Sequence, residues 1–307
     1  MSQKFFEQPA KAWSWVQASR PPSQVYIFLP LLLGQLLTVA HGYPFSWISF
    51  LLCHLYGLFC QLYIVFANDA ADVVTDRCNT TFTLFSGGSR VLVENKLSTK
   101  MLMSAATGSA LLCLIIGLII GFISGKWLPL LLIIIGIMLF WSYSFPPLSL
   151  SYRGGGEFLQ MVGVGLVLPL TGFYVQSGDL QTFPWPVTIL TMLLALTCAM
   201  STALPDEPSD RKCRKKTSAV ILGVAKSQKI ILCLNIFSIV LLITLPIVAV
   251  SFWHRIIMAI ACLMILLPGF YMLDCRPGSA CLSRFVALNV AFSLCPLLAL
   301  CFIWLLA

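Results

Sequence analysis

Long runs of apolar residues follow one another along almost the whole chain, and the polar residues gather in the short segments between them. A run of about 20 apolar residues is long enough to cross a bilayer as a helix. The pattern predicts nine transmembrane helices, at 22–40, 47–71, 98–123, 127–145, 157–176, 186–204, 229–250, 254–273 and 282–306. We therefore expect an all-α, polytopic membrane protein in which residues 1–307 form one bundle, with the last helix tilted or kinked at Pro296.

The composition supports this fold class. The chain is 59% hydrophobic and 10% charged, whereas about a quarter of the residues in a soluble globular domain are charged. Residues Met1–Ser19 have no compact apolar core after a basic start, so no cleavable signal peptide is expected. Their aromatic and charged residues are interspersed, which predicts an N-terminal segment (1–20) that lies in the membrane interface.

The basic residues specify an orientation. With the N-terminus in the cytoplasm, 17 of the 19 Lys and Arg fall in inner segments, and Lys126 and Arg255 are the exceptions. An excess of Lys and Arg marks the cytoplasmic loops of membrane proteins. The net charge of +8 therefore describes mainly the cytoplasmic face, where it attracts anionic lipid. No module typical of nucleic-acid binding is evident, so nucleic acid is not an expected partner.

The 12 cysteines show neither CxxC pairs nor the spacing of a zinc site. Most fall within predicted spans, where cysteine behaves as a small apolar residue. We expect them to stay unpaired. Cys78 and Cys213 lie beside the acidic motifs described next.

Six of the 11 carboxylates gather in two short windows, "NDAADVVTD" (68–76) and "PDEPSD" (205–210). Both windows lie at the predicted cytoplasmic end of a span. On a helix, Asn68, Asp72 and Asp76 are four residues apart and share one face. Asp206 and Asp210 have the same spacing, although the prolines of the second window predict that a helix ends or restarts there.

Clustered carboxylates need a compensating cation, because like charges raise each other's pKa and a charge at membrane depth costs roughly 2.5 kcal/mol or more. Mg²⁺ prefers hard oxygen ligands and is typically shared between carboxylates and substrate phosphates. The simpler interpretation is two solvated helix ends whose acids pair with nearby Lys and Arg. Two clusters at one membrane depth favour a metal site, with these candidate ligands: Asn68, Asp69, Asp72, Asp76, Asp206 and Asp210.

Residues 77–97 and 205–228 are predicted to be cytoplasmic loops of an active site. In the first loop, Gly87 and Gly88 permit close approach of the backbone to an anion, and Arg90 and Lys96 offer charge-assisted hydrogen bonds. The stretch "SYRGGGE" (151–157) follows no strand, so it is not a nucleotide loop, but Arg153 at a helix start is a candidate phosphate ligand. Charged groups above apolar walls suit an amphiphile with a diphosphate head and a hydrocarbon tail.

These motifs resemble those of the UbiA superfamily of membrane prenyltransferases. "NDAADVVTD" matches the N-D-x-x-D-x-x-x-D signature, and "DEPSD" matches the second D-x-x-x-D signature. "RPPSQVYIFLPLLLG" (20–34) is similar to the pattern of the first span in that family. "YSFPPLSLSYRGGGEF" (143–158), "GFYVQSG" (172–178) and "LPDEPSDRKCRKKTSAVILG" (204–223) are similar to the branch that prenylates 1,4-dihydroxy-2-naphthoate for menaquinone. The chain departs from that branch at Arg214, where a glycine is usual, and at Ser218, where a leucine is usual.

The resemblance implies an Mg²⁺-dependent transfer of an isoprenyl chain from a prenyl diphosphate to an aromatic acceptor, in a bacterial inner membrane. Two Mg²⁺ ions would bridge the diphosphate to the two acidic clusters, with Asp72, Asp76, Asp206 and Asp210 as catalytic residues. Asp69 would be a ligand or would orient the acceptor. The ring of Tyr143 would stabilise the allylic cation, or would be an ordinary interfacial aromatic. The implied diphosphate-binding residues are Arg20, Arg90, Lys96, Arg153, Lys212 and Lys215.

Several alternatives remain open. Within the superfamily, the acceptor could be 4-hydroxybenzoate, a haem or chlorophyll precursor or a secondary metabolite, and a terpene cyclase is a further possibility. Outside it, intramembrane carboxylates also occur in cation transporters. Transport needs acids that can be reached from both faces, and the predicted outer loops hold only Asp179. This asymmetry favours an enzyme.

Overall fold

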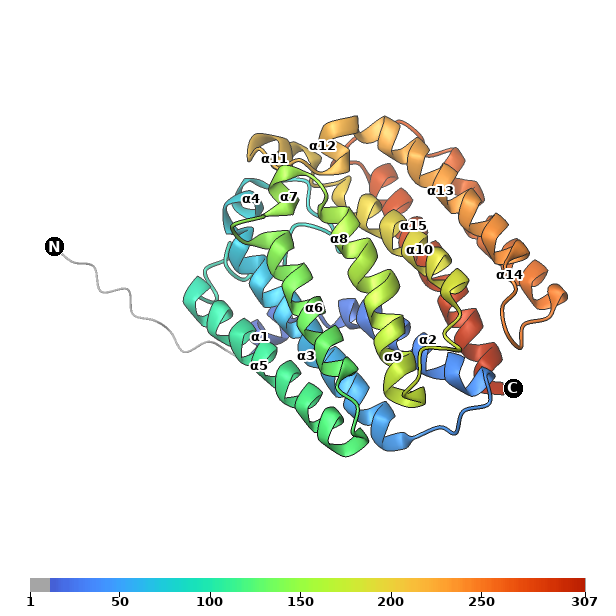
Figure 1. The fold of residues 1–307 in the computed structure, drawn as a ribbon. Helices are drawn as coiled ribbons and strands as arrows, with labels where there is room; N and C mark the ends of the chain where they lie inside the picture. Colours follow the sequence, from blue (N-terminus) through green and yellow to red (C-terminus); the bar gives the residue numbers. More distant parts are fainter. Residues whose placement is uncertain (1–11, 307) are drawn as a thin grey trace.

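The structure is a computed structural model that describes residues 12–306, and every regular element among them is helical (Figure 1). The elements are α1 (Ala12–Ser19), η1 (Pro21–Gln24), α2 (Val25–Ala40), α3 (Trp47–Ala71), α4 (Val73–Cys78), α5 (Thr99–Ser124), α6 (Leu128–Ser144), α7 (Leu150–Arg153), α8 (Gly156–Val162), η2 (Gly163–Val167), α9 (Leu168–Ser177), α10 (Trp185–Ala203), α11 (Glu207–Lys212), α12 (Ser218–Leu222), α13 (Val224–Thr244), α14 (Phe252–Phe270) and α15 (Ala280–Leu306). The predicted all-α fold is confirmed.

Eight helical segments in the described part of the chain are long and apolar enough to cross a membrane. The remaining predicted span, 127–145, corresponds to α6, a shorter apolar helix of 17 residues. The interfacial prediction for residues 1–20 falls partly outside the described residues. Its described part forms α1, where Trp13 is exposed and Ala18 packs into the core.

Two predicted segments differ from the observed ones. The helix predicted at 229–250 is α13, which begins five residues earlier and ends at Thr244, shortly before Pro246. A proline two residues on explains this end, because its ring prevents the helix from continuing. The predicted loop 205–228 therefore holds α11, α12 and the first turn of α13.

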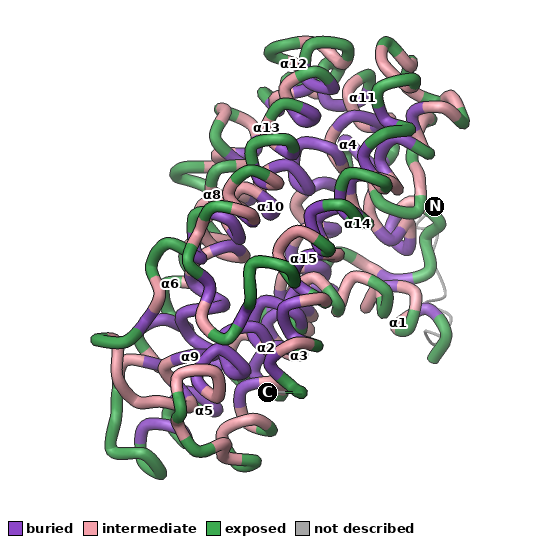
Figure 2. Tube along the Cα trace, turned by 90° about the vertical axis from the view of Figure 1, so that its right-hand side faces the viewer, coloured by how far each residue is buried: buried purple, intermediate pink, exposed green. Residues whose placement is uncertain are grey.

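The long helices pack side by side into one bundle, and Figure 2 shows buried positions on the inner parts of the trace and exposed positions along the outside. Many outward-facing side chains are large and apolar, including Leu55, Ile115, Phe122 and Met138. Helices that are apolar on both their inner and outer faces are typical of a protein surrounded by lipid.

Helices α2 and α9 approach each other through a pair of glycines. A Cβ atom added at Gly34 would lie 2.1 Å from the carbonyl oxygen of Pro169, and one added at Gly172 would lie 2.2 Å from that of Leu31. Small residues let the backbones of membrane helices come this close. The contact matters for the site, because the first turns of α2 line the cavity described below.

Substituting Gly172→Ala is expected to lower the free energy of unfolding by about 1–3 kcal/mol, as overpacking of a tight core does. The matched control is Gly108→Ala on α5, where an added Cβ meets no atom within 4 Å. That change is expected to be neutral or to stabilise the helix by up to about 1 kcal/mol. Thermal unfolding in detergent, followed by size-exclusion chromatography, measures the melting temperatures of both variants. Equal melting temperatures for the two variants would contradict the close α2–α9 contact.

The segment between α14 and α15 is closed by a disulfide between Cys275 and Cys281. The prediction that the cysteines stay unpaired is wrong for these two. The chain turns between them at Gly278, whose φ is +79°, and this turn brings the two ends of the segment together. The other cysteines are free.

The short helices α4, α7, α11 and α12 gather at one end of the bundle, the upper end in Figure 1. The two acidic windows fall on or beside α4 and α11. We refer to this end as the acidic end.

Candidate active site

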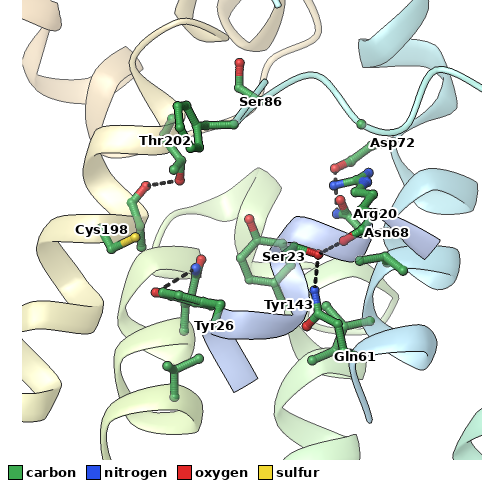
Figure 3. A pocket seen from close by; sticks show the side chains of 18 of the residues that line it. Arg20, Ser23, Tyr26, Gln61, Asn68, Asp72, Ser86, Tyr143, Cys198 and Thr202 are labelled. Atoms are coloured by element: carbon green, nitrogen blue, oxygen red, sulfur yellow. Dashed lines mark hydrogen bonds between the residues drawn. The ribbon is translucent and has the colours of Figure 1, made fainter. Parts of the chain in front are cut away.

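A cavity of about 1130 Å³ begins at the acidic end and continues down between the long helices. Its lining comes from α1, η1, α2, α3, α4, α6, α8, η2, α9, α10, α11 and α15, together with the loops between α4 and α5 and between α11 and α12. Figure 3 shows polar side chains at several depths, with Asp72 and Asn68 near the mouth and Gln61 and Tyr26 farther down. Both acidic windows contribute to this one cavity.

The first acidic window is interrupted at Asp72. Helix α3 ends at Ala71, and α4 begins at Val73. The predicted continuous face over Asn68, Asp72 and Asp76 is therefore broken by one non-helical residue, but all three side chains still line the cavity.

The Asp72 carboxylate is held by three neighbours. Oδ1 accepts a hydrogen bond from the hydroxyl of Tyr152 (3.0 Å). Oδ2 accepts from Nδ2 of Asn68 (2.9 Å) and from Nζ of Lys215 (2.8 Å). Because charge-assisted hydrogen bonds of this kind are strong and directional, the orientation of Asp72 is fixed before any ligand binds.

Asp69 is buried beside the cavity and does not line it. It forms an ion pair with Arg20 and accepts hydrogen bonds from the backbone N–H (3.2 Å) and the hydroxyl of Ser89. These contacts fix Arg20 at the mouth of the cavity. As a metal ligand, Asp69 stays a prediction.

The second window behaves as its prolines predict, because α10 ends at Ala203 and α11 begins at Glu207. Asp206 accepts from Nδ2 of Asn79 (2.7 Å) and from the backbone N–H of Gly87 (3.1 Å). Asp210 lies 4.0 Å from Nζ of Lys215. One ammonium group therefore stands between the carboxylates of the two windows.

The glycine pair of the loop lies against these acids. Gly87 and Gly88 both have positive φ, +80° and +72°. A Cβ at Gly88 would lie 2.2 Å from Oδ2 of Asp76. The close backbone approach that the sequence predicts does occur, and the anions approached are carboxylates of the protein itself.

The predicted diphosphate-binding residues fall into two groups. Arg20, Arg90 and Lys215 line the cavity, whereas Lys96, Arg153 and Lys212 do not. The guanidinium of Arg90 lies 4.4 Å from the centre of the Phe82 ring and donates a hydrogen bond to the carbonyl of Asp76. Lys96 is turned away and pairs with Glu94.

Burial is the main reason why the carboxylic acids of the site have raised pKa values. It raises the pKa of Asp76 to about 7, and the charges of Asp72 and Asp69 raise that pKa further. Burial also raises the pKa of Asp210 to about 7, which the nearby Lys215 ammonium opposes. The pKa of Asp206 is raised as well, again by burial. A bound cation would stabilise the ionised form of these carboxylates.

Tyr143 lies on the wall below the acids (Figure 3). Its ring is stacked on Phe140 at a centroid distance of 6.0 Å. A Cβ at Gly156 would lie 2.9 Å from the Tyr143 ring. The third glycine of "RGGG" therefore makes room for this ring, while Gly154 and Gly155, with φ of +98° and +99°, form the turn between α7 and α8.

The structure adds residues that the sequence analysis did not assign. Asn79 and Tyr152 hold Asp206 and Asp72 at the mouth. Gln61 and Gln160 line the deeper part of the cavity. A signal for Gln61 is present in the sequence, since it is an isolated strongly polar residue within the apolar run of α3.

Within residues 12–306, no three His, Cys, Asp or Glu side chains come close enough to hold a metal ion by themselves. The donor set nevertheless fits Mg²⁺, which binds through one or two carboxylates and takes its other ligands from water and phosphate. Buried carboxylates with raised pKa values, from both acidic windows, line the same cavity. A cation that completes its shell with ligand oxygens would fit between them.

Known proteins resemble this chain along most of its length. A relative from Bacillus subtilis, 1,4-dihydroxy-2-naphthoate octaprenyltransferase, is 26% identical over 67% of this chain and 65% of its own length. A relative from Synechocystis, 2-carboxy-1,4-naphthoquinone phytyltransferase, is 25% identical over 76% of this chain and 74% of its own. The chain thus spans just under two thirds of the first relative.

A solved structure shares the fold. It is a UbiA homolog from Archaeoglobus fulgidus bound to DMAPP and Mg²⁺, and it aligns over 91% of this chain and 97% of its own with a TM-score of 0.65 at 17% identity. The family model described as the UbiA prenyltransferase family matches residues 27–305, which include both acidic windows and the nine apolar helices, apart from the first two residues of α2 and the last residue of α15. The chain is therefore an integral, multi-pass membrane protein and belongs to the UbiA prenyltransferase family.

Proposed function

We propose that this protein transfers an isoprenyl chain from a prenyl diphosphate to an aromatic acceptor of the 1,4-dihydroxy-2-naphthoate type, with Mg²⁺ as cofactor. The single observation that carries the proposal is the arrangement of the cavity. Carboxylates of two acidic windows from distant parts of the sequence line its mouth around the same Lys215 ammonium, and apolar walls continue beneath them. The names of the two curated relatives support a naphthoate-type acceptor.

The basic side chains of the cavity bind the diphosphate of the prenyl substrate. Arg20, Arg90 and Lys215 line the mouth of the cavity, where they neutralise charge that grows on the diphosphate as its bond to the prenyl carbon breaks. Preorganised charges of this kind act most strongly where charge develops in the transition state. The roles predicted for Lys96, Arg153 and Lys212 have no such support, because these side chains do not line the cavity.

Bound between the windows, Mg²⁺ would supply further positive charge for the departing diphosphate. Asn68, Asp72 and Asp76 would hold it on one side and Asp206 and Asp210 on the other. The DMAPP and Mg²⁺ bound to the Archaeoglobus homolog support a prenyl diphosphate and Mg²⁺ as ligands here.

The walls protect the reacting carbon from water. Leu139, Phe140, Val164 and Leu168 line the cavity below the charged mouth and suit a hydrocarbon chain. The face of the Tyr143 ring offers cation–π stabilisation to the allylic cation. The diphosphate leaves with the electron pair of the broken C–O bond, and the acceptor ring then forms a carbon–carbon bond to the cation. The attacked ring carbon releases its proton or, where it bears a carboxylate, CO₂, and the electron pair of that bond restores the aromatic ring.

The positions of the basic residues support a cytoplasmic location for the acidic end, because they concentrate in segments that are inner when the N-terminus is cytoplasmic. The bacterial sources of the two curated relatives support a bacterial inner membrane. In that orientation the cavity takes its polar substrates from the cytoplasmic side.

Binding of Mg²⁺ is expected to weaken as the pH falls from about 8 to about 6, because protons and metal compete for the same carboxylates. Since burial raises the pKa of both Asp76 and Asp210 to about 7, each is largely protonated at the lower pH and must lose its proton to bind metal. Calorimetric titration of Mg²⁺ in the presence of a non-hydrolysable prenyl diphosphate analogue measures the affinity for Mg²⁺. Repeating it in two buffers of different ionisation enthalpy gives the number of protons released. A binding constant that is independent of pH, with no proton released at neutral pH, would refute this.

The direct test is an assay of the purified protein in detergent with farnesyl diphosphate and Mg²⁺. Diphosphate release is measured in three reactions, one that contains 1,4-dihydroxy-2-naphthoate, one that contains 4-hydroxybenzoate and one without acceptor. The products are identified by mass spectrometry. Release that requires the naphthoate and yields its prenylated product supports the proposal. A 4-hydroxybenzoate product would change the acceptor, release without any acceptor would indicate a cyclase, and no release in any arm would exclude a prenyltransferase.

A further inference from the structure

Gln61 is a buried polar residue in the apolar part of the cavity. It lies in the middle of α3, is 5% exposed and lines the cavity. Its Nε2 donates to the hydroxyl of Ser23 at 2.7 Å, and that hydroxyl donates in turn to the carbonyl of Arg20. The Gln61 carbonyl oxygen accepts no hydrogen bond from any residue between 12 and 306. If the amide were turned over, its NH₂ group would face the cavity instead, so one half of the amide is open to a ligand in either orientation.

A second polar pair lies about one helical turn farther along the chain from Ser23, at the start of α2. The hydroxyl of Tyr26, three residues after Ser23, donates to the carbonyl of Ala195 and accepts from Nε2 of Gln160, both at 3.2 Å. Gln160 also lines the cavity, and its carbonyl oxygen has no donor among the described side chains or backbone groups. Figure 3 shows Tyr26 and Gln61 on the two sides of Tyr143, which lies between them in this view.

The depth of the two amides identifies what they contact. Gln61 precedes Asn68 by seven residues on α3. Because an α-helix rises about 1.5 Å per residue, Gln61 lies about 10 Å below Asn68, farther from the acidic end. The neighbouring wall positions, among them Ile64 and Val164, are apolar. A hydrocarbon tail cannot form hydrogen bonds, whereas the other substrate carries ring oxygens that can pair with an amide.

We infer that the amides of Gln61 and Gln160 form the acceptor subsite, where each binds one ring oxygen of a para-dihydroxy aromatic. This inference rests on the proposed function, since it assigns the acceptor of that reaction. Two hydrogen-bonding groups on different walls select for an acceptor with oxygens on opposite edges of its ring. A site built to bond a substrate hydroxyl discriminates strongly against an analogue that lacks it, because its own polar groups are then left unpaired.

The test compares Gln61→Leu and Gln160→Leu with the control Leu58→Ile, a position on α3 whose side chain is exposed and does not line the cavity. The acceptors are 1,4-dihydroxy-2-naphthoate and 1-hydroxy-2-naphthoate, which lacks one of the two hydroxyls. Each glutamine variant is expected to raise KM for the dihydroxy acceptor at least tenfold and to reduce the preference for it over the monohydroxy analogue. KM for the prenyl diphosphate is expected to change less than twofold, and the control is expected to behave as the wild type.

Equilibrium binding of 1,4-dihydroxy-2-naphthoate to each protein, without prenyl diphosphate, separates this inference from the proposed function. Binding that depends on the glutamines without any turnover would keep the subsite and reject the reaction. Turnover with an unchanged acceptor KM and an unchanged preference in both glutamine variants would keep the reaction and overturn the subsite. Wild-type protein that neither binds nor converts the acceptor would overturn both.

Discussion

Substitution of either Asp72→Ala or Asp210→Ala is expected to lower kcat by at least about 10³-fold, because each removes an anchor for the cation that balances the leaving diphosphate. The two residues come from different windows and contact the same ammonium group, Nζ of Lys215, at 2.8 and 4.0 Å. Loss of one cannot be compensated by the other, since the two lie on opposite sides of the proposed metal site. The readout is diphosphate release at saturating substrate.

Glu207→Ala is the matched control for these variants. Glu207 belongs to the same "PDEPSD" window but pairs with Arg211 on the next turn and does not line the cavity. Its loss removes an exposed i, i+4 ion pair worth about 0.3–0.5 kcal/mol and is expected to change kcat less than threefold. All three variants should insert into membranes and elute like the wild type. If either aspartate variant keeps more than a tenth of wild-type activity with Mg²⁺ limiting, the two-window site is wrong.

The fold could be predicted from the sequence because lipid imposes a simple rule. Every spanning segment must satisfy its backbone internally, so each long apolar run becomes a helix. The rule says little about irregular helices. Residues predicted as one span at 157–176 contain a π-helical turn, Gly163–Val167, which depends on packing against α10. Gly165 allows that packing, because a Cβ there would lie 2.4 Å from the Cα of Met192.

The acidic part of the site could also be predicted, because charged residues are rare in this chain and their clustering is informative. Which of the basic side chains enters the cavity could not be predicted. Lys212, Lys215 and Lys216 lie within five residues of one another, yet Lys215 is buried in the cavity while the other two are exposed. The direction of each side chain depends on the turn between α11 and α12, where Arg214 has a φ of +60°. No periodic pattern encodes a turn of this kind.

The polar groups deep in the cavity illustrate a different limit. Gln61 stands out within an apolar run, but its partner Ser23 is 38 residues away in the sequence. The pairing exists because η1 and α3 lie side by side. A single sequence shows that Gln61 is unusual, and the fold shows which residue it contacts.

Lys215→Met is expected to lower kcat/KM for the prenyl diphosphate by about 100-fold or more, in the range found when one preorganised stabilising group is removed. Lys215 is 7% exposed. Burial by itself lowers the pKa of its ammonium, but Asp72 and Asp210 raise that pKa on balance well above its usual value, so the group is charged at neutral pH. The variant therefore removes a full positive charge from between the two windows.

Lys216→Met is the control, because Lys216 is exposed on the same segment and does not line the cavity. We expect it to change kcat/KM less than twofold. Breaking a buried ion pair can also destabilise a protein by about 3–5 kcal/mol, so the loss of activity needs a readout that misfolding would not change.

The pH profile provides that readout. Burial raises the pKa of Asp210 to about 7, and Lys215 limits this rise. Without the ammonium, the pKa of Asp210 moves higher, and a higher pH is needed to ionise it for metal binding. The midpoint of the rise in kcat/KM with pH should therefore shift to higher pH in Lys215→Met and stay in place in Lys216→Met. A lowered rate with an unshifted midpoint would mean that Lys215 only supports the fold, whereas a shifted midpoint would assign it to the electrostatics of the site.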